Sequence, residues 1–175
     1  MMKKKIIVIV SFFILLLAIF IAFRFFSPQK IAKEYSAVVL NIDDYSLVET
    51  TTVKIEGETI LPIPFIRDRP IFKGKVSINN ISATLEENAL NDLVFYKNEV
   101  LDNMWSALNY YSYDENSFIA RTATIGILTI ENIKMNKLSI ELLPEYKNKN
   151  IGLYIVAPVN NLDEAIQIYK DIMLK

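Results

Sequence analysis

The pattern of apolar and polar positions divides the chain into three segments. The first is an apolar run over residues 6–26, which is interrupted by Ser11 and closed by Arg24-Phe25-Phe26. As a helix, these 21 residues would be about 31 Å long, which matches the hydrocarbon core of a bilayer. Because backbone polar groups in lipid must pair within a single segment, the run predicts a transmembrane anchor helix over 6–26.

The second segment carries apolar residues at helical spacing. Ser27 and Pro28 suit the N-cap and the first position of a helix. The apolar positions that follow are Ile31, Tyr35, Val38, Val39 and Ile42. We therefore expect a juxtamembrane helix over about 28–41, within a linker at 27–46 that precedes a folded domain at 47–175.

The third segment alternates apolar and polar residues with period two, which is typical of strands with one buried face. The predicted strands lie at 53–56, 72–78, 118–130, 134–143 and 151–159. Glu56-Gly57-Glu58 indicates a turn. The stretch 61–65 indicates an edge or a loop, because Pro62 and Pro64 cannot donate ladder hydrogen bonds.

Two stretches interrupt this alternation. At 81–85 the apolar positions resume in shifted phase, as a bulge or tight turn would produce. At 100–108 the apolar residues fit one face of a short helix, whereas 105–112 also has strand-like aromatic content. Both interpretations of the second stretch stay open.

The last element is an amphipathic helix. Asn161 with Glu164 three residues later resembles a capping box. The apolar stripe consists of Leu162, Ala165, Ile166, Tyr169, Ile172 and Met173. The expected fold class is α+β, with an N-terminal transmembrane helix followed by a mainly antiparallel β-sheet domain that the C-terminal helix covers.

Charge separates the leader from the domain. Residues 1–27 hold four positive charges and no negative ones, so residues 28–175 hold 15 positive and 20 negative charges, a net charge of −5. The contiguous Lys3-Lys4-Lys5 favours a cytoplasmic tail at 1–5, with the C-terminal domain outside the cell membrane as a single-pass protein. An uncleaved anchor is favoured over a signal peptide because the apolar run is long and no small-x-small site follows it.

The composition excludes several kinds of chemistry. The chain has no His and no Cys, which removes serine–histidine and cysteine–histidine catalysis, disulfides and thiolate metal sites. Neither dinucleotide nor P-loop glycine motifs occur. We expect no catalytic residues, no cofactor and no metal. The adjacent carboxylates, such as Glu56 with Glu58, leave a small cell-envelope hydrolase as an alternative.

Two groups of residues could bind a partner. Trp105, Tyr110, Tyr111 and Tyr113 would form a platform for a protein or a sugar if they were exposed together. Arg67 and Arg69 place two guanidinium groups on one turn, where they could hold a phosphate or a carboxylate. Nucleic acid is not an expected partner, because the domain is acidic and has no basic stripe.

Short motifs carry a resemblance over about residues 50–175. They are Val53-Lys-Ile55-Glu-Gly57, Phe72-Lys-Gly74-Lys-Val76-Ser-Ile78, and Ala157-Pro158 ahead of Glu164-Ala165. The combination resembles uncharacterised single-anchor exported proteins of low-GC Gram-positive bacteria. The resemblance implies an anchor followed by a β-rich exported domain, and it carries no activity or catalytic residue.

Together these features predict a membrane-anchored extracytoplasmic protein that is a non-enzymatic binding or accessory module of the cell envelope. Its expected partners are membrane lipid, through residues 6–26, and an envelope protein or wall polymer. An accessory subunit of a membrane complex, acting through the anchor helix, is a further alternative.

Overall fold

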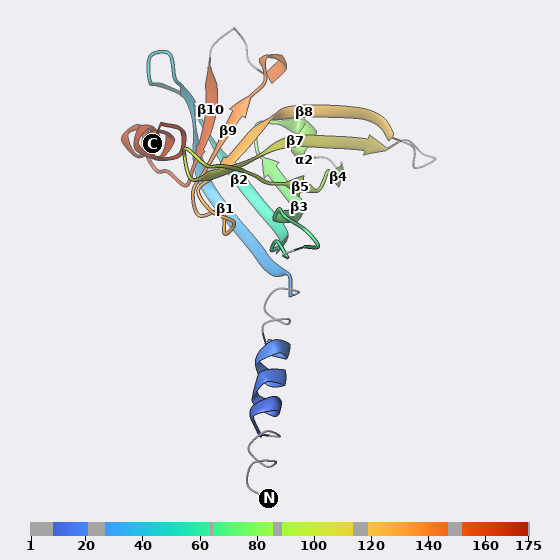
Figure 1. Cartoon of the computed structure of the whole chain (residues 1–175). Coiled ribbons are helices and arrows are strands. Elements are labelled where there is room, and N and C mark those ends of the chain that lie inside the picture. The colour runs from blue at the N-terminus through green and yellow to red at the C-terminus, as the bar shows by residue number, and fades with distance from the viewer. Residues whose placement is uncertain are drawn as a thin grey trace, which may run out of the picture.

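The computed structural model describes residues 9–20, 27–63, 65–85, 89–113, 119–146 and 152–174. A helix at 9–20 is followed by a curled antiparallel sheet, against which the C-terminal helix packs (Figure 1). The tail at 1–5 and the remainder of the expected anchor, residues 6–8 and 21–26, lie outside the described residues. Within the described ranges, no helix has both the length and the apolar character needed to cross a membrane.

One antiparallel sheet contains every named strand of the described part of the chain. In chain order the strands are β1 (Gln29–Asn41), β2 (Ser46–Ile60), β3 (Ile71–Ile78), β4 (Ala89–Leu90), β5 (Leu93–Val94), β6 (Tyr96–Asn98), β7 (Asn103–Tyr113), β8 (Ile119–Ile130), β9 (Leu138–Leu142) and β10 (Leu153–Ala157). Their spatial order is β4-β7-β8-β9-β10-β1-β2-β3-β5, with β6 beside β7. Because β5 also contacts β7, the sheet curls until its two ends approach each other.

Three helical elements are described besides the helix at 9–20, and only the last of them is longer than about one turn. They are α2 (Ser82–Leu85), the 3₁₀ turn η1 (Pro144–Tyr146) and α3 (Leu162–Met173). The predicted cap of α3 is confirmed, because Asn161 Oδ1 accepts a hydrogen bond from the Glu164 amide at 2.9 Å. The Glu164 carboxylate in turn accepts from the Asn160 amide at 2.8 Å, one residue earlier than in a regular capping box.

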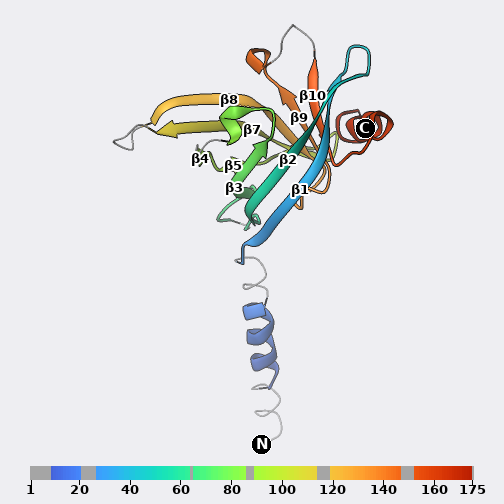
Figure 2. The same ribbon diagram turned by 180° about the vertical axis from the view of Figure 1, so that it is seen from behind.

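The sheet buries apolar side chains on both of its faces. The larger core fills the inside of the curl and includes Val39, Phe72 and Leu128. A second core lies between the outer face and α3, where Val38 and Leu40 contact the helix cluster around Tyr169. Figure 2 shows the molecule from behind, with the C-terminal helix beside β1 and β10. The predicted antiparallel sheet with a C-terminal helix is therefore confirmed.

The juxtamembrane helix predicted at 28–41 is wrong, because these residues form β1. Along its first half, odd-numbered residues from Ile31 to Ala37 point inward and even-numbered ones outward. Lys33 falls among the inward positions and hides this alternation. Residues 37–40 are all buried, because the curl covers one face and α3 the other. A continuous apolar run of this length fits a doubly covered strand as well as a helix.

The structure also decides three further local interpretations. The turn at 56–58 is absent, since β2 continues through Gly57, which pairs with Gly74 of β3. The shifted phase at 81–85, interpreted as the mark of a bulge or tight turn, follows a turn at 79–80 and belongs to α2. In α2 the buried Thr84 hydroxyl donates to Ile81 O and bonds both polar backbone atoms of Ile78. The helix considered at 100–108 is replaced by a turn and by β7.

Candidate functional site

The structure brings two of the predicted partner-binding residues together on the surface. The Arg69 guanidinium carbon lies 4.3 Å from the centroid of the Tyr96 ring. The Trp105 ring stacks on the Tyr96 ring, with 4.9 Å between the ring centroids and 22° between the ring planes. Trp105 and Tyr96 each keep 39% of their surface exposed. We call Arg69, Tyr96 and Trp105 the aromatic stack.

A tight hairpin positions two members of this stack. Tyr96 of β6 and Trp105 of β7 are direct cross-strand partners, an arrangement that stabilises antiparallel pairs. The turn between the strands is held by Asn98 Oδ1, which accepts from the Val100 and Leu101 amides at 3.0 and 3.2 Å. Tyr96 was not predicted as a site residue. A hairpin whose turn lies between Asn98 and Asn103 would have placed it opposite Trp105.

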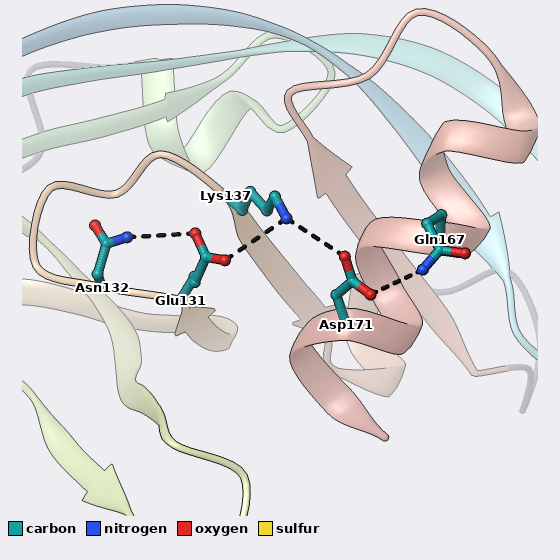
Figure 3. A network of polar contacts seen from close by, with 5 residues as sticks. All are labelled: Glu131, Asn132, Lys137, Gln167 and Asp171. Atoms are coloured by element: carbon teal, nitrogen blue, oxygen red, sulfur yellow. Dashed lines mark hydrogen bonds and ion pairs between the residues drawn. The ribbon is translucent and has the colours of Figure 1, made fainter. Parts of the chain in front are cut away.

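The hairpin is also fixed to the C-terminal helix. The buried Asn103 side chain donates from Nδ2 to Ile172 O of α3 at 2.6 Å. Figure 3 shows a separate link between α3 and the connection that joins β8 to β9, in which Lys137 Nζ lies 3.6 Å from Glu131 Oε1 and 3.3 Å from Asp171 Oδ2 of α3. Gln167 donates to the same Asp171 carboxylate at 2.8 Å, and Asn132 donates to Glu131 at 3.3 Å (Figure 3). The Asn103 bond therefore ties the hairpin that carries the aromatic stack to α3.

The other predicted aromatic residues do not join the stack. Tyr110 is 1% exposed, and its hydroxyl donates to Val76 O inside the curl, so its expected place on a surface platform is wrong. Tyr111 is half-buried and lies six residues beyond Trp105 on β7, which corresponds to about 20 Å along a strand. The side chain of Tyr113 lies outside the described part of the chain.

The two arginines are separated rather than paired. Arg67 turns back into its own loop, where its guanidinium donates to Leu61 O at 2.8 Å. Arg69 instead covers Tyr96 and lies 3.6 Å from the Asp68 carboxylate. The phosphate or carboxylate clamp that this pair could have formed is therefore not assembled, and Arg69 contributes to the aromatic stack instead.

Burial of Tyr110 gives stability a pH dependence. Burial raises the pKa of the Tyr110 hydroxyl above its ordinary value of 10.0. The unfolded chain therefore releases this proton first, so the stabilisation is complete below about pH 10 and is lost as the pH rises further. We expect Tyr110→Phe to make the alkaline fall in unfolding free energy less steep, measured by urea unfolding from about pH 8 to about pH 11. An unchanged slope would contradict this.

A cavity of about 180 Å³ opens at the end of the curl away from the start of β1. Its wall is apolar at Val39, Ile78 and Ile155, and polar at Glu49 and Thr51. Thr51 is buried, and its hydroxyl has no hydrogen-bond partner within the described residues. The cavity contains one carboxylate side chain among its described lining residues, so it does not bring two acids together.

The unpaired hydroxyl leads to a test by substitution. Because a buried polar group without a partner is costly, Thr51→Val should raise the free energy of unfolding by about 1 kcal/mol. Thr84→Val is the matched control, since that buried hydroxyl is fully bonded, and it should lower the free energy by about 1–2 kcal/mol. Chemical denaturation measures both, and effects of the same sign would contradict the expectation.

The carboxylates of the outer sheet face lie among lysines. Glu56 bonds Lys54 at 2.9 Å and stands opposite Lys75 in the register. Glu58 stands between Lys30 and Lys73 on the neighbouring strands. This arrangement is typical of a charge-balanced sheet surface. Within the described ranges, no group of three or more acidic side chains is arranged to hold a metal ion.

Comparison with known proteins gave no match, whether to family models, to curated proteins or to solved structures.

Proposed function

We propose that this protein is a membrane-anchored, non-enzymatic binding module of the cell envelope. In this proposal residues 6–26 hold it in the membrane and the C-terminal domain lies outside. The aromatic stack forms its contact with a partner protein. The observation that carries the proposal is the exposed stack of the three side chains, because tryptophan, tyrosine and arginine are the residue types most enriched at energetic centres of protein interfaces.

Support for the anchor comes from the helix at 9–20. Every one of its side chains is exposed, including Phe12, Phe13 and Phe20. An apolar surface of this extent requires a covering in water. The sequence continues apolar beyond both ends of this helix, and a lipid environment would cover it on all sides.

Support for partner binding comes from how the stack is held. Its hairpin is tied to α3 through Asn103, so its side chains are already ordered before a partner arrives. Ordering side chains on association costs about 0.5–1.5 kcal/mol for each one, and a preformed stack avoids much of this.

Site-directed photocrosslinking in the source cells tests the proposal. A photoreactive amino acid at position 105 should give one discrete adduct with an envelope protein. The same group at Val48, an exposed apolar position on β2, should give none. Arg69→Ala and Tyr96→Ala, introduced one at a time, should each reduce adduct yield at 105 because they remove one layer of the stack. Equal adducts at 105 and 48 would refute the proposed surface.

The chain offers two built-in reporters for follow-up. Trp105 is the single tryptophan, so its emission should change when the captured partner is added to the purified chain.

The sequence contains no cysteine, so a cysteine placed at Asp43 can be labelled alone. A membrane-impermeant thiol reagent should label it in intact cells, whereas protection until lysis would place the domain on the other side.

A further inference from the structure

The loop between β2 and β3 presents an apolar tip to solvent. Phe65 is fully exposed and Ile66 is 72% exposed. The loop is nevertheless held by hydrogen bonds, because Ile63 N donates to Arg67 O at 2.8 Å and Arg67 N donates to Ile63 O at 2.9 Å. Phe65 has a φ of 65°, which is rare for a bulky residue. Backbone strain of this kind is typical of functional sites. We call the described residues between β2 and β3, 61–63 and 65–70, the Phe65 loop.

A basic groove lies near this loop, beside the start of β1. Its charged lining residues within the described ranges are Lys30, Lys33 and Lys134, and it includes Gln29 and Thr59. The Lys33 ammonium is fixed, since it donates to Lys134 O and to Asn136 Oδ1 at 2.6 Å each. Lys30 keeps Glu58 as its cross-strand neighbour, and that carboxylate is shared with Lys73.

Both features lie at the end of the domain where the chain arrives from its apolar segment. Gln29 pairs with Thr59, and the Phe65 loop begins two residues later. Figures 1 and 2 both show the connection between β2 and β3 beside the first residues of β1. Only residues 27 and 28 separate the apolar run from β1, so the connection spans at most about 10 Å.

We propose that this end of the domain docks on the surface of the bilayer that holds the anchor, with Phe65 and Ile66 inserted and the lysine groove on an anionic lipid headgroup. An apolar tip beside clustered lysines is the combination that binds anionic interfaces. Asp68 offsets Arg69 at 3.6 Å, so the groove supplies the cationic charge and the loop supplies the apolar surface. The inference rests on the proposed anchor, which brings the domain within reach.

Depth-dependent quenching of single labels tests the docking on the full chain in vesicles. Because the chain has no native cysteine, a fluorophore can be placed at Ile66→Cys, Asp43→Cys or Leu17→Cys separately. In vesicles of phosphatidylcholine with phosphatidylglycerol, brominated lipid should quench the labels at 66 and 17 and leave the label at 43 unquenched. Removing phosphatidylglycerol should reduce quenching at 66 at least twofold and leave the label at 17 unchanged.

Substitutions separate the contribution of the apolar loop from that of the lysine groove. Phe65→Ser should reduce quenching of the label at 66 in both lipid mixtures. Lys30→Gln with Lys134→Gln should remove the dependence on phosphatidylglycerol, whereas Lys54→Gln with Lys97→Gln, an equal charge change elsewhere, should not. Free inorganic phosphate should not compete; full competition by it would indicate a soluble phosphate ligand and overturn the lipid assignment.

The outcomes distinguish this inference from the proposed function. Strong quenching at 17 with equal, weak signals at 66 and 43 would overturn the docking and keep the anchor. Quenching at 66 without quenching at 17 would overturn the anchor and keep a peripheral docking surface. Absence of quenching at both positions would overturn both.

Discussion

Phe72→Ala is expected to lower the free energy of unfolding by about 4 kcal/mol. The Phe72 side chain is fully buried in the larger core. Its ring covers the cross-strand pair Gly57–Gly74, such that a Cβ atom added to either glycine would lie within 2.9 Å of the ring. Removing the ring therefore leaves a void over two residues that have no side chains to fill it.

Phe72→Leu is the control for that measurement. Leucine keeps most of the apolar volume, so it should cost about half as much as alanine. Urea unfolding of the full chain in detergent, followed by Trp105 emission, measures both variants. Equal losses of unfolding free energy in the alanine and leucine variants would show that the void over the glycine pair is not the cause of the destabilisation.

Gly126→Ala should lower the free energy of unfolding by about 3 kcal/mol or more, because the new Cβ meets backbone that cannot yield cheaply. The added atom would lie 1.9 Å from Glu141 O on the neighbouring strand β9 and 2.9 Å from the carbonyl carbon. Relief requires β8 and β9 to separate at the register pair that joins Gly126 and Leu142.

Gly152→Ala provides the matched control. There the added Cβ would meet only side-chain atoms nearby, of which the closest is the Ile42 Cγ1 at 2.6 Å. Because a side chain can change rotamer, the expected loss is under about 1 kcal/mol. Hydrogen exchange of the β8 and β9 amides should increase in Gly126→Ala alone. Similar losses in the two variants would contradict the argument from backbone contact.

The sequence was sufficient to predict the strands that have one polar face. Alternation at 72–78 and the β-rich composition at 118–130 correspond to β3 and β8, and the Asn161 cap placed the start of α3. It was insufficient where tertiary contacts decide which residues are buried. Residues 37–40 are buried because α3 covers them from outside, and no local pattern reveals a cover that lies more than 100 residues away.

The candidate site was predicted in its residue types and not in its assembly. Trp105 and Arg69 were identified, but they meet only through Tyr96. Tyr110 and Trp105 lie on one strand five residues apart, and an odd separation places them on opposite faces. The helix interpretation of 100–108 concealed that alternation. Once β7 is recognised as a strand, one aromatic residue belongs to the core and the other to the surface.

The position of β1 has a mechanical consequence. This strand continues directly from the apolar segment, and it lies between β10 and β2 rather than at an edge. It is paired with β2 from Gln29↔Thr59 to Asn41↔Ser46, and with β10 over its last four residues. In the proposed arrangement, with the chain anchored in the membrane and bound to a partner, tension would pull along β1 and load these hydrogen bonds in parallel. The domain should therefore resist shear, so that the partner contact yields before the fold does.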